Sequence, residues 1–447
     1  MVGESQIPIA SQALAKRFAT WLALVYGTEF GLVGTHLPFF PVWLRAVGVD
    51  AAWIGIITAV PSLMRFTTLP LVTSFAERHQ AVRGGIIAMS FAMTIAFAVL
   101  GLQHQALPIL LCYAVISCVS TPIIPLIDAY ALRGVRQYGL SYGRLRLWGS
   151  VAFAAGALAC GVTIDVIAAK DLIWIIAGMA ALSALASLGL EPLAPLKSSP
   201  AALQGGSALL REKGFLAIIV SSALIQSSHS AYYVIASIAW QHEGFGGLSV
   251  AGLWTLGVVA EIVVFALSPR LSLPPANLVV IAASCAVMRW VLTALAPPLP
   301  ILALVQLMHG LTFGLTQVGT MGLMVHHVGG HVMARGQGYL AACGGIVAVA
   351  TYVLSGAIFE RYGQNVYYVM AVIAASGGFV MCSPGIGFRI TPRVQLRADR
   401  SGCHHSEARG RGRARAKVVR QDRRSARAAS AALPGPLPAR LRPCSRP

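Results

Sequence analysis

The chain has 447 residues, of which 56% are hydrophobic and only 11% are charged, and its mean hydropathy is +0.71. Soluble globular domains carry roughly 25% charged residues, so this composition excludes an ordinary water-soluble fold and favours lipid as the surrounding solvent. The net charge of +19 does not indicate a nucleic-acid partner, because 15 Lys and Arg against 3 Asp and Glu lie from residue 390 onward.

Twelve apolar runs follow one another along the chain, and each is long enough to cross a bilayer as a helix, which takes about 20 residues. The runs are expected at residues 18–44, 51–76, 84–102, 107–131, 147–168, 172–190, 215–240, 248–268, 276–296, 299–325, 337–359 and 366–384. The first run is too long for the apolar core of a signal peptide, so we predict that it is the first transmembrane helix. The predicted fold class is an all-α membrane protein with twelve transmembrane helices.

A polar segment rich in Pro, Ser and Gly separates the sixth run from the seventh and divides the chain into two halves. We predict a cytoplasmic N-terminus at 1–17, an N-terminal six-helix bundle at 18–190, a linker at 191–214, a C-terminal six-helix bundle at 215–384 and a tail at 385–447. One set of loops carries thirteen Lys and Arg, and the opposite set carries three. Because basic loops stay on the cytoplasmic side, we expect an inner-membrane protein with the linker and both termini in the cytoplasm.

The tail is rich in Arg, Ala and Pro and has no apolar periodicity, so we predict that it is disordered. Its basic run at 409–417 suits anionic lipid or RNA, but a plain disordered extension is favoured and no nucleic-acid partner is expected. The eight cysteines form no CxxC pair, and most lie in apolar runs. We therefore predict neither a disulfide framework nor a metal site.

Ionisable side chains inside apolar runs are costly in lipid, so each one is a candidate for function. The candidates come from both halves and are Glu29, His36, Arg65, Asp128, Arg144, Arg146, His229, Glu261, Arg289 and His309. Glu29 and His36 are two helical turns apart and share one helix face. Asp128 and Arg146 flank a short connection, so an ion pair between them is sterically easy. Such a pair would either serve the solute or only join two helices.

Five short motifs spread over both halves resemble the 3-phenylpropionic acid permease group, which belongs to the lactose-permease-like side of the major facilitator superfamily. The motifs are Leu37-Pro-Phe-Phe-Pro-Val-Trp-Leu44, Pro125-Leu-Ile-Asp128, Tyr142-Gly-Arg-Leu-Arg-Leu-Trp-Gly-Ser150, His229-Ser-Ala-Tyr-Tyr233 and Leu253-Trp-Thr-Leu-Gly-Val-Val-Ala-Glu261. The resemblance runs from about residue 20 to 384. It implies the major facilitator fold, in which two six-helix bundles enclose a solute site near the middle of the membrane.

The resemblance to lactose permease itself implies roles for individual positions. Its sugar-binding acid falls on Asp128, and its arginine eighteen residues later falls on Arg146. Its arginine in the ninth helix matches Arg289, and its histidine in the tenth helix matches His309. A polar site built from both halves is the expected consequence.

Two positions depart from lactose permease. The proton-carrying acid one turn after the histidine is Thr312 here, and the acid of the eighth helix is Val258. Glu261 lies one turn further along that helix, as it does in the 3-phenylpropionic acid permease group. The departures argue against sugar as the solute. They make Glu261 the expected proton carrier, with Arg289 and His309 beside it and Glu29 as the alternative carrier.

The residues and the resemblance together predict a proton-coupled symporter that imports a small organic solute, either an aromatic or another carboxylate such as a phenylpropionate-like acid. We expect the two bundles to rock around a site at their interface. The expected solute-binding residues are Asp128, Arg65, Arg146, Trp148, Tyr233 and Trp254. Asp128 is expected to orient Arg146. Glu77 and Arg78, which retain the outline of a facilitator loop motif, either act as a cytoplasmic gate or serve only as topogenic charge.

Two alternatives stay open at this point. A sugar or nucleoside proton symporter fits the same Asp128 and Arg146 positions. A membrane enzyme or a non-transporting receptor on the same scaffold is the alternative from another class, but no GxSxG, HExxH or phosphate-loop motif is present. The expected partners are a small-molecule solute, protons and the lipid bilayer. We expect a monomer without a cofactor, and not an enzyme.

Overall fold

The computed structural model describes residues 9–140, 142–193, 206–328 and 333–383. The predicted tail at 385–447 lies outside these ranges, as do residues 1–8 of the predicted N-terminus and 194–205 of the predicted linker. Every regular element in the described ranges is a helix, which confirms the predicted all-α class. These residues belong to one unit that extends to Phe388.

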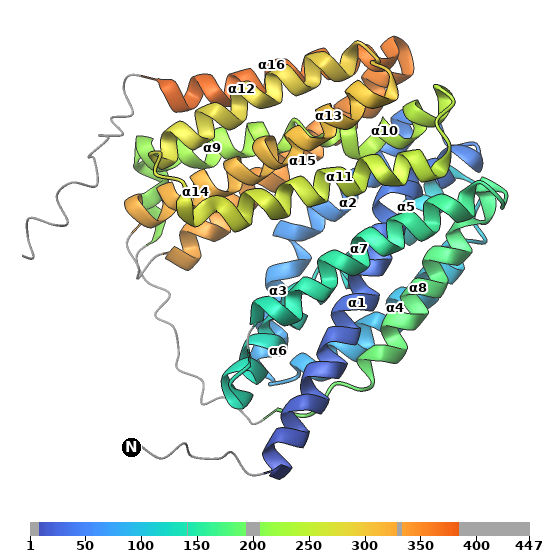
Figure 1. Cartoon of the computed structure of the whole chain (residues 1–447), viewed down its shortest axis with the longest axis vertical. Coiled ribbons are helices and arrows are strands. Elements are labelled where there is room, and N and C mark those ends of the chain that lie inside the picture. The colour runs from blue at the N-terminus through green and yellow to red at the C-terminus, as the bar shows by residue number, and fades with distance from the viewer. Residues whose placement is uncertain (1–8, 141, 194–205, 329–332, 384–447) are drawn as a thin grey trace, which may run out of the picture. The chain divides into compact units, whose positions relative to one another are not determined.

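The first half of the chain forms eight α-helices (Figure 1). They are α1 Ile9–Ala46, α2 Ala51–Phe66, α3 Thr68–Arg78, α4 Val82–Leu100, α5 Ala106–Ser120, α6 Ile123–Tyr138, α7 Tyr142–Ile164 and α8 Leu172–Ser187. Each consists largely of apolar residues, because a helix satisfies its own backbone hydrogen bonds and thus suits a lipid environment. We call these helices the N-terminal group.

The second half repeats this pattern and forms the C-terminal group. Its helices are α9 Lys213–Ser227, α10 Ser230–His242, α11 Gly247–Leu267, α12 Pro275–Ala294, α13 Leu299–His309, the π-helical segment η4 Gly310–Gly314, α14 Leu315–His327, α15 Met333–Tyr362 and α16 Val366–Cys382. Figure 1 shows the two groups as separate sets of helices, blue to green and green to orange.

By length and apolar character, nine helical stretches in the described ranges are able to cross a membrane, or ten if the bent pair α2 and α3 counts as one. Twelve spans were expected, so the full count stays a prediction. Two features account for the difference. One stretch, Arg335–Cys382, contains both α15 and α16, which only a short 3₁₀ turn separates. In addition, α1 is not counted among these stretches, because polar residues such as Thr28, Glu29 and His36 lower its mean hydropathy.

Several of the long spans are interrupted rather than continuous. The axes of α2 and α3 differ by 43° across Thr67. Pro122 lies between α5 and α6, and Ser228 and His229 lie between α9 and α10. The span from α13 to α14 contains the π-helical segment, a form that recurs at functional positions in helices. The breaks in α2–α3, α9–α10 and α13–α14 affect helices that line the cavities described below, whereas α5 and α6 do not line them.

The two groups touch where α2 packs on α15 and where α7 packs on α11. In each contact two glycines bring the backbones together. A Cβ atom on Gly356 would lie 2.2 Å from the carbonyl oxygen of Ala51, and one on Gly247 would lie 2.3 Å from that of Gly161. Such short distances leave no room for a side chain, which is why small residues mark close helix contacts in membranes.

A carboxylate reaches across each of these contacts to the first turn of the opposite helix. Glu360 Oε2, near the end of α15, accepts a hydrogen bond of 3.0 Å from the backbone N–H of Ala51 in α2. Asp165 Oδ1, just after α7, accepts one of 2.8 Å from the backbone N–H of Gly247 in α11. Both carboxylates satisfy N–H groups that a helix leaves unpaired at its start. We call these two bonds the inter-group caps.

Candidate functional site

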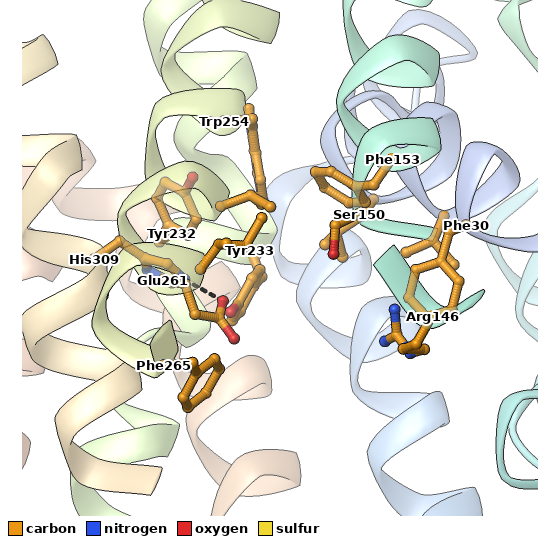
Figure 2. A pocket seen from close by; sticks show the side chains of 14 residues that line it. Phe30, Arg146, Ser150, Phe153, Tyr232, Tyr233, Trp254, Glu261, Phe265 and His309 are labelled. Atoms are coloured by element: carbon orange, nitrogen blue, oxygen red, sulfur yellow. Dashed lines mark ion pairs between the residues drawn. The ribbon is translucent and has the colours of Figure 1, made fainter. Parts of the chain in front are cut away.

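A cavity of about 440 Å³ lies between the two groups and is lined by both. We call it the central cavity (Figure 2). Its lining residues are Phe30, Val33 and Leu37 of α1, Arg146, Ser150 and Phe153 of α7, Tyr232 and Tyr233 of α10, Trp254, Val258, Glu261, Ile262 and Phe265 of α11, and His309 of α13. A mostly apolar and aromatic wall with a few polar groups is the usual character of a small-molecule site.

Arg146 supplies the cation on the N-terminal side of the central cavity. Its guanidinium lies 3.9 Å from the centre of the Phe30 ring and 5.7 Å from that of Tyr26. Stacking on aromatic faces holds a guanidinium in place without using its N–H donors. Figure 2 shows Arg146 on the opposite side of the cavity from Glu261 and Tyr233. The donors are thus available for an anionic group in the cavity.

Glu261 and His309 form the polar pair on the C-terminal side. Nε2 of His309 lies 3.8 Å from Oε2 of Glu261. Nδ1 of the same ring lies 2.9 Å from Nη1 of Arg289. Because a guanidinium only donates hydrogen bonds, Nδ1 must accept, and a neutral ring then carries its proton on Nε2. His309 therefore turns an N–H toward Glu261 and links it to Arg289.

Arg289 is completely buried behind this pair. Its Nη2 donates to Gln306 at 2.9 Å, and its Nη1 also donates to Thr312 at 3.3 Å. The guanidinium lies 5.0 Å and 4.6 Å from the ring centres of Tyr232 and Trp290. Among the described residues, the ion pairs within 4.0 Å are Arg17–Glu191 and His309–Glu261. Arg289 is thus held by neutral groups rather than by an acid.

Thr312 connects Arg289 to a second buried histidine. Nε2 of His229 lies 3.0 Å from the Thr312 hydroxyl, and Nδ1 of His229 faces the backbone carbonyls of Ile225 and Gln226. Since Nδ1 donates to a carbonyl, Nε2 of the neutral ring accepts from the threonine. The position where lactose permease has an acid therefore joins a cation to a histidine here, without a charge of its own.

A second cavity, of about 610 Å³, adjoins the central cavity and shares Leu37 and Tyr233 with it. We call it the glutamine cavity because Gln226, Gln317 and Gln337 all line it. The rest of its wall is formed by Leu37, Ser62, Arg65, Ser222, Ala223, Ser227, Ser230, Tyr233, Phe313, Met321, Leu340, Ala341, Gly344, Gly345, Ala348 and Tyr352. Arg65, one of the expected solute contacts, belongs to this cavity rather than to the central one.

The expected ion pair between Asp128 and Arg146 is not formed in this structure. Oδ1 of Asp128 accepts hydrogen bonds from the hydroxyls of Tyr26, at 2.5 Å, and Tyr142, at 2.9 Å. Tyrosine hydroxyls thus satisfy the carboxylate, while Arg146 stacks on Phe30. Asp128 is not among the lining residues of either cavity. The predicted orientation of Arg146 by Asp128 thus does not occur through a direct ion pair in this conformation, and the role of Asp128 stays a prediction.

The remaining predicted residues divide between the cavity and other surroundings. Tyr233 and Trp254 line the central cavity as expected. Trp148 does not line either cavity, and 57% of its surface is exposed. Glu29 is buried within the N-terminal group, where its Oε2 accepts a bond of 2.7 Å from Ser183. Arg78 is exposed at the end of α3.

The predicted cytoplasmic gate consists of Glu77 and Arg78. The side chain of Glu77, the acid of that expected pair, lies outside the described residues. Nothing in the described part of the chain therefore bears on the gate.

Sequence reasoning missed most of the aromatic wall and all of the glutamines. Phe30, Val33 and Leu37 recur at helical spacing and mark the cavity face of α1. That spacing is present in the sequence and would have identified the cavity face of α1, on which neither Glu29 nor His36 lies. His36 instead lies against Tyr113 and Phe40, away from both cavities.

A bundle of apolar helices around a cavity that both halves line defines a polytopic membrane transport protein. The chain belongs to the MFS_1 like family, whose model matches residues 19–370. This places it among the major facilitator permeases, which are transporters and not enzymes. The recognition of this superfamily from short motifs is thereby confirmed.

Similar proteins transport several kinds of solute. The chain is 31% identical over 369 residues to the probable 3-phenylpropionic acid transporter of Escherichia coli (strain K12), covering 80% of this chain and 96% of that protein. It is 27% identical over 307 residues to the maltose permease of Geobacillus stearothermophilus, covering 66% and 76%. Among solved structures, the nucleoside transporter NupG superposes with a TM-score of 0.72 at 16% identity, covering 81% of this chain and 98% of that one. The last similarity concerns the fold alone.

Proposed function

We propose that this chain is a proton-coupled symporter that imports an aromatic or other carboxylate across the inner membrane by alternating access. In the proposed orientation both termini are cytoplasmic, and the inter-group caps lie on the periplasmic side. The protein acts as a monomer, and the N-terminal group moves against the C-terminal group around the central cavity. The similarity to the 3-phenylpropionic acid transporter supports this solute class.

The observation that carries the proposal is the placement of one cation and one acid on opposite walls of a single small cavity. Arg146, on α7, belongs to one group, and Glu261, on α11, belongs to the other. The guanidinium matches a carboxylate in shape and charge. Tyr233, Trp254 and Phe153 supply aromatic surface on which a ring packs.

Solute and proton then bind together for an electrostatic reason. A carboxylate solute on Arg146 brings a second negative charge into the cavity that already contains Glu261. Like charges at close range favour protonation of one of the two acids. Binding of the solute and binding of a proton to Glu261 thus help each other, and such linkage is reciprocal.

The neighbours of Glu261 support this role. His309 turns an N–H toward the carboxylate and connects it to the buried Arg289. Val258, one turn earlier on α11, also lines the cavity, where lactose permease has its acid. Glu261 is therefore the carboxylate on the C-terminal side of the central cavity. Glu29 is less suited to carry the proton, because its carboxylate bonds to Ser183 inside the N-terminal group.

Uptake into proteoliposomes tests the proposal. With 3-phenylpropionate as the probe, the unaltered protein should accumulate solute when a pH gradient is imposed. Glu261→Gln should retain exchange between equal pools and lose accumulation. Glu212→Gln is the matched control, because Glu212 lies just before α9 and lines neither cavity. Accumulation by Glu261→Gln but not by Glu29→Gln would move the proton carrier to α1. If neither substitution uncouples transport, proton symport is excluded.

A further inference from the structure

The carboxylate of Glu261 lines the central cavity with its hydrogen-bonding capacity unused. Its ion pair with Nε2 of His309 spans 3.8 Å, which is longer than a hydrogen bond, and 25% of its side chain is exposed. No closer polar contact joins the carboxylate to a described residue. An ionised carboxylate has about four lone-pair sites for donors. Glu261 is therefore open to a donor that an occupant of the cavity brings.

Arg146 has the matching position on the other wall. Its guanidinium lies 3.9 Å from the centre of the Phe30 ring, and no hydrogen bond joins it to a described residue. Its N–H donors therefore remain for an occupant of the cavity. Arg146 and Glu261 attract each other electrostatically across the cavity, from the opposite sides on which Figure 2 shows them. A free cation and a free acceptor thus face the same space.

The space between these charges is largely apolar. Among the described residues that line the cavity of about 440 Å³, Arg146 and Glu261 carry the formal charges, because the ring of His309 is neutral. The positive end of the cavity thus lies on α7 and the negative end on α11. The apolar side chains of its wall include Val33, Phe153, Val258, Ile262 and Phe265. An occupant with opposite charges at its two ends and an apolar body between them matches this arrangement.

We infer that the central cavity also binds zwitterions whose carboxylate and ammonium groups lie at opposite ends of an apolar ring, with the carboxylate on Arg146 and the ammonium on Glu261. This inference rests on the proposed function, in which a plain carboxylate binds together with a proton on Glu261. The ammonium group of a zwitterion supplies the positive charge that the proton supplies for a plain acid. Such a solute is therefore bound without the coupled proton, and both kinds of solute leave the total charge of the cavity neutral.

The number of protons bound distinguishes the two kinds of solute. A plain acid favours protonated Glu261, whereas an ammonium group favours the ionised carboxylate, because only the ionised form pairs with a cation. The groups around Glu261 that carry a charge or titrate are Arg146 on α7, Tyr232 and Tyr233 on α10, His309 on α13 and Arg289 on α12 behind it. These groups are common to both complexes. The binding of a plain acid should therefore take up about one proton more than the binding of a zwitterion.

Binding of two matched ligands to the purified protein tests the inference. The first, 3-(4-aminomethylphenyl)propionate, has an ammonium group at the far end of the ring, and the second, 3-(4-ethylphenyl)propionate, has the same shape without that charge. Thermal stabilisation should show that the aminomethyl acid binds at least about tenfold more tightly than the ethyl acid, as expected for a charged hydrogen bond. Titration calorimetry in buffers of different ionisation enthalpy should show that binding of the ethyl acid takes up about one proton more.

Variants identify the groups that bind the two ends of the zwitterion. Glu261→Gln should remove the preference for the aminomethyl acid and retain binding of the ethyl acid. Arg146→Gln should weaken binding of both acids about tenfold, because both lose a charged contact with their carboxylate. Glu212→Gln changes an acid that lines neither cavity, so it should retain both the preference and the difference in proton uptake.

The outcomes separate the two proposals. If the unaltered protein takes up plain acids but binds the aminomethyl acid no more tightly than the ethyl acid, the inference is wrong and the proposed function stands. A preference that persists in Glu261→Gln also overturns the inference, as does tighter binding of phenylalanine, whose two charges lie at one end of the molecule, than of the aminomethyl acid. If no plain acid is taken up or stabilises the protein, the proposed function itself fails.

Discussion

The inter-group caps predict a measurable shift between the two conformations of the protein. In the structure, Asp165 and Glu360 each satisfy a backbone N–H at the start of a helix in the other group. Both bonds exist only while the groups are in contact at this end. We expect that replacing both residues with alanine destabilises the described conformation and favours one that is open at the periplasmic end.

The size of the effect follows from the kind of bond. Loss of a side-chain cap at a helix N-terminus costs about 1 kcal/mol, within a range of about 0.5–2 kcal/mol. The caps belong to separate helix contacts, so their effects should add. Asp165→Ala with Glu360→Ala then shifts the equilibrium by about 2 kcal/mol, or about 30-fold at 1.4 kcal/mol per factor of ten. Each single substitution should give about fivefold.

Labelling of the central cavity from outside the cell measures this shift. Val33 lines the cavity on α1, so Val33→Cys in a cysteine-free protein reports access of a membrane-impermeant maleimide. The labelling rate follows the fraction of protein that is open to the outside, and the double variant should label about 30-fold faster. Asp171→Ala is the control, because this exposed acid precedes α8 without capping it. An unchanged rate in the double variant, or an equal increase in the control, would refute the reasoning.

Two further predictions concern charged residues within the helices. Because the Tyr26 hydroxyl donates to Asp128 and the Arg146 guanidinium also lies over the Tyr26 ring, the effects of Asp128→Asn and Arg146→Gln on solute affinity should depart from additivity by about 0.5 kcal/mol or more; additive effects in a double-mutant cycle would show that Tyr26 does not couple the two residues. Arg289 is fully buried and donates hydrogen bonds to His309, Gln306 and Thr312, so Arg289→Met should lower the thermal denaturation temperature, because each buried acceptor left unpaired costs about 1–3 kcal/mol. Uptake should be lost as well, because His309 loses the donor to Nδ1; an unchanged denaturation temperature would contradict this.

The helices were largely predictable from the sequence, because the length of an apolar run is determined by the thickness of the bilayer. The run expected at 248–268 corresponds to α11 Gly247–Leu267, and the run at 276–296 to α12 Pro275–Ala294. The interruption between α9 and α10 was not predictable in this way. A run of apolar residues does not show where a continuous span changes direction.

The site was predictable in its residue types but not in its pairings. Helical periodicity correctly places Glu29 and His36 on one face of α1, but it does not say which neighbour that face meets. Ser183 and Tyr113, from α8 and α5, are those neighbours. In the same way, the partners of Asp128 are hydroxyl groups whose positions depend on tertiary packing. Closeness in the sequence alone favoured Arg146 as the partner of Asp128.

The interruptions of the inner helices mean that a bundle need not move as one rigid body. His229 lies at the break between α9 and α10, and His309 ends α13 directly before the π-helical segment. A span that is interrupted in this way consists of two helical segments, and each segment can tilt without the other. These histidines connect the interruptions to other helices, because His229 accepts a hydrogen bond from Thr312 of η4 and His309 accepts one from Arg289 of α12. A change of charge at Glu261 would then be transmitted as a local bend, and the two ends of the pathway could open in sequence rather than by a single rocking step.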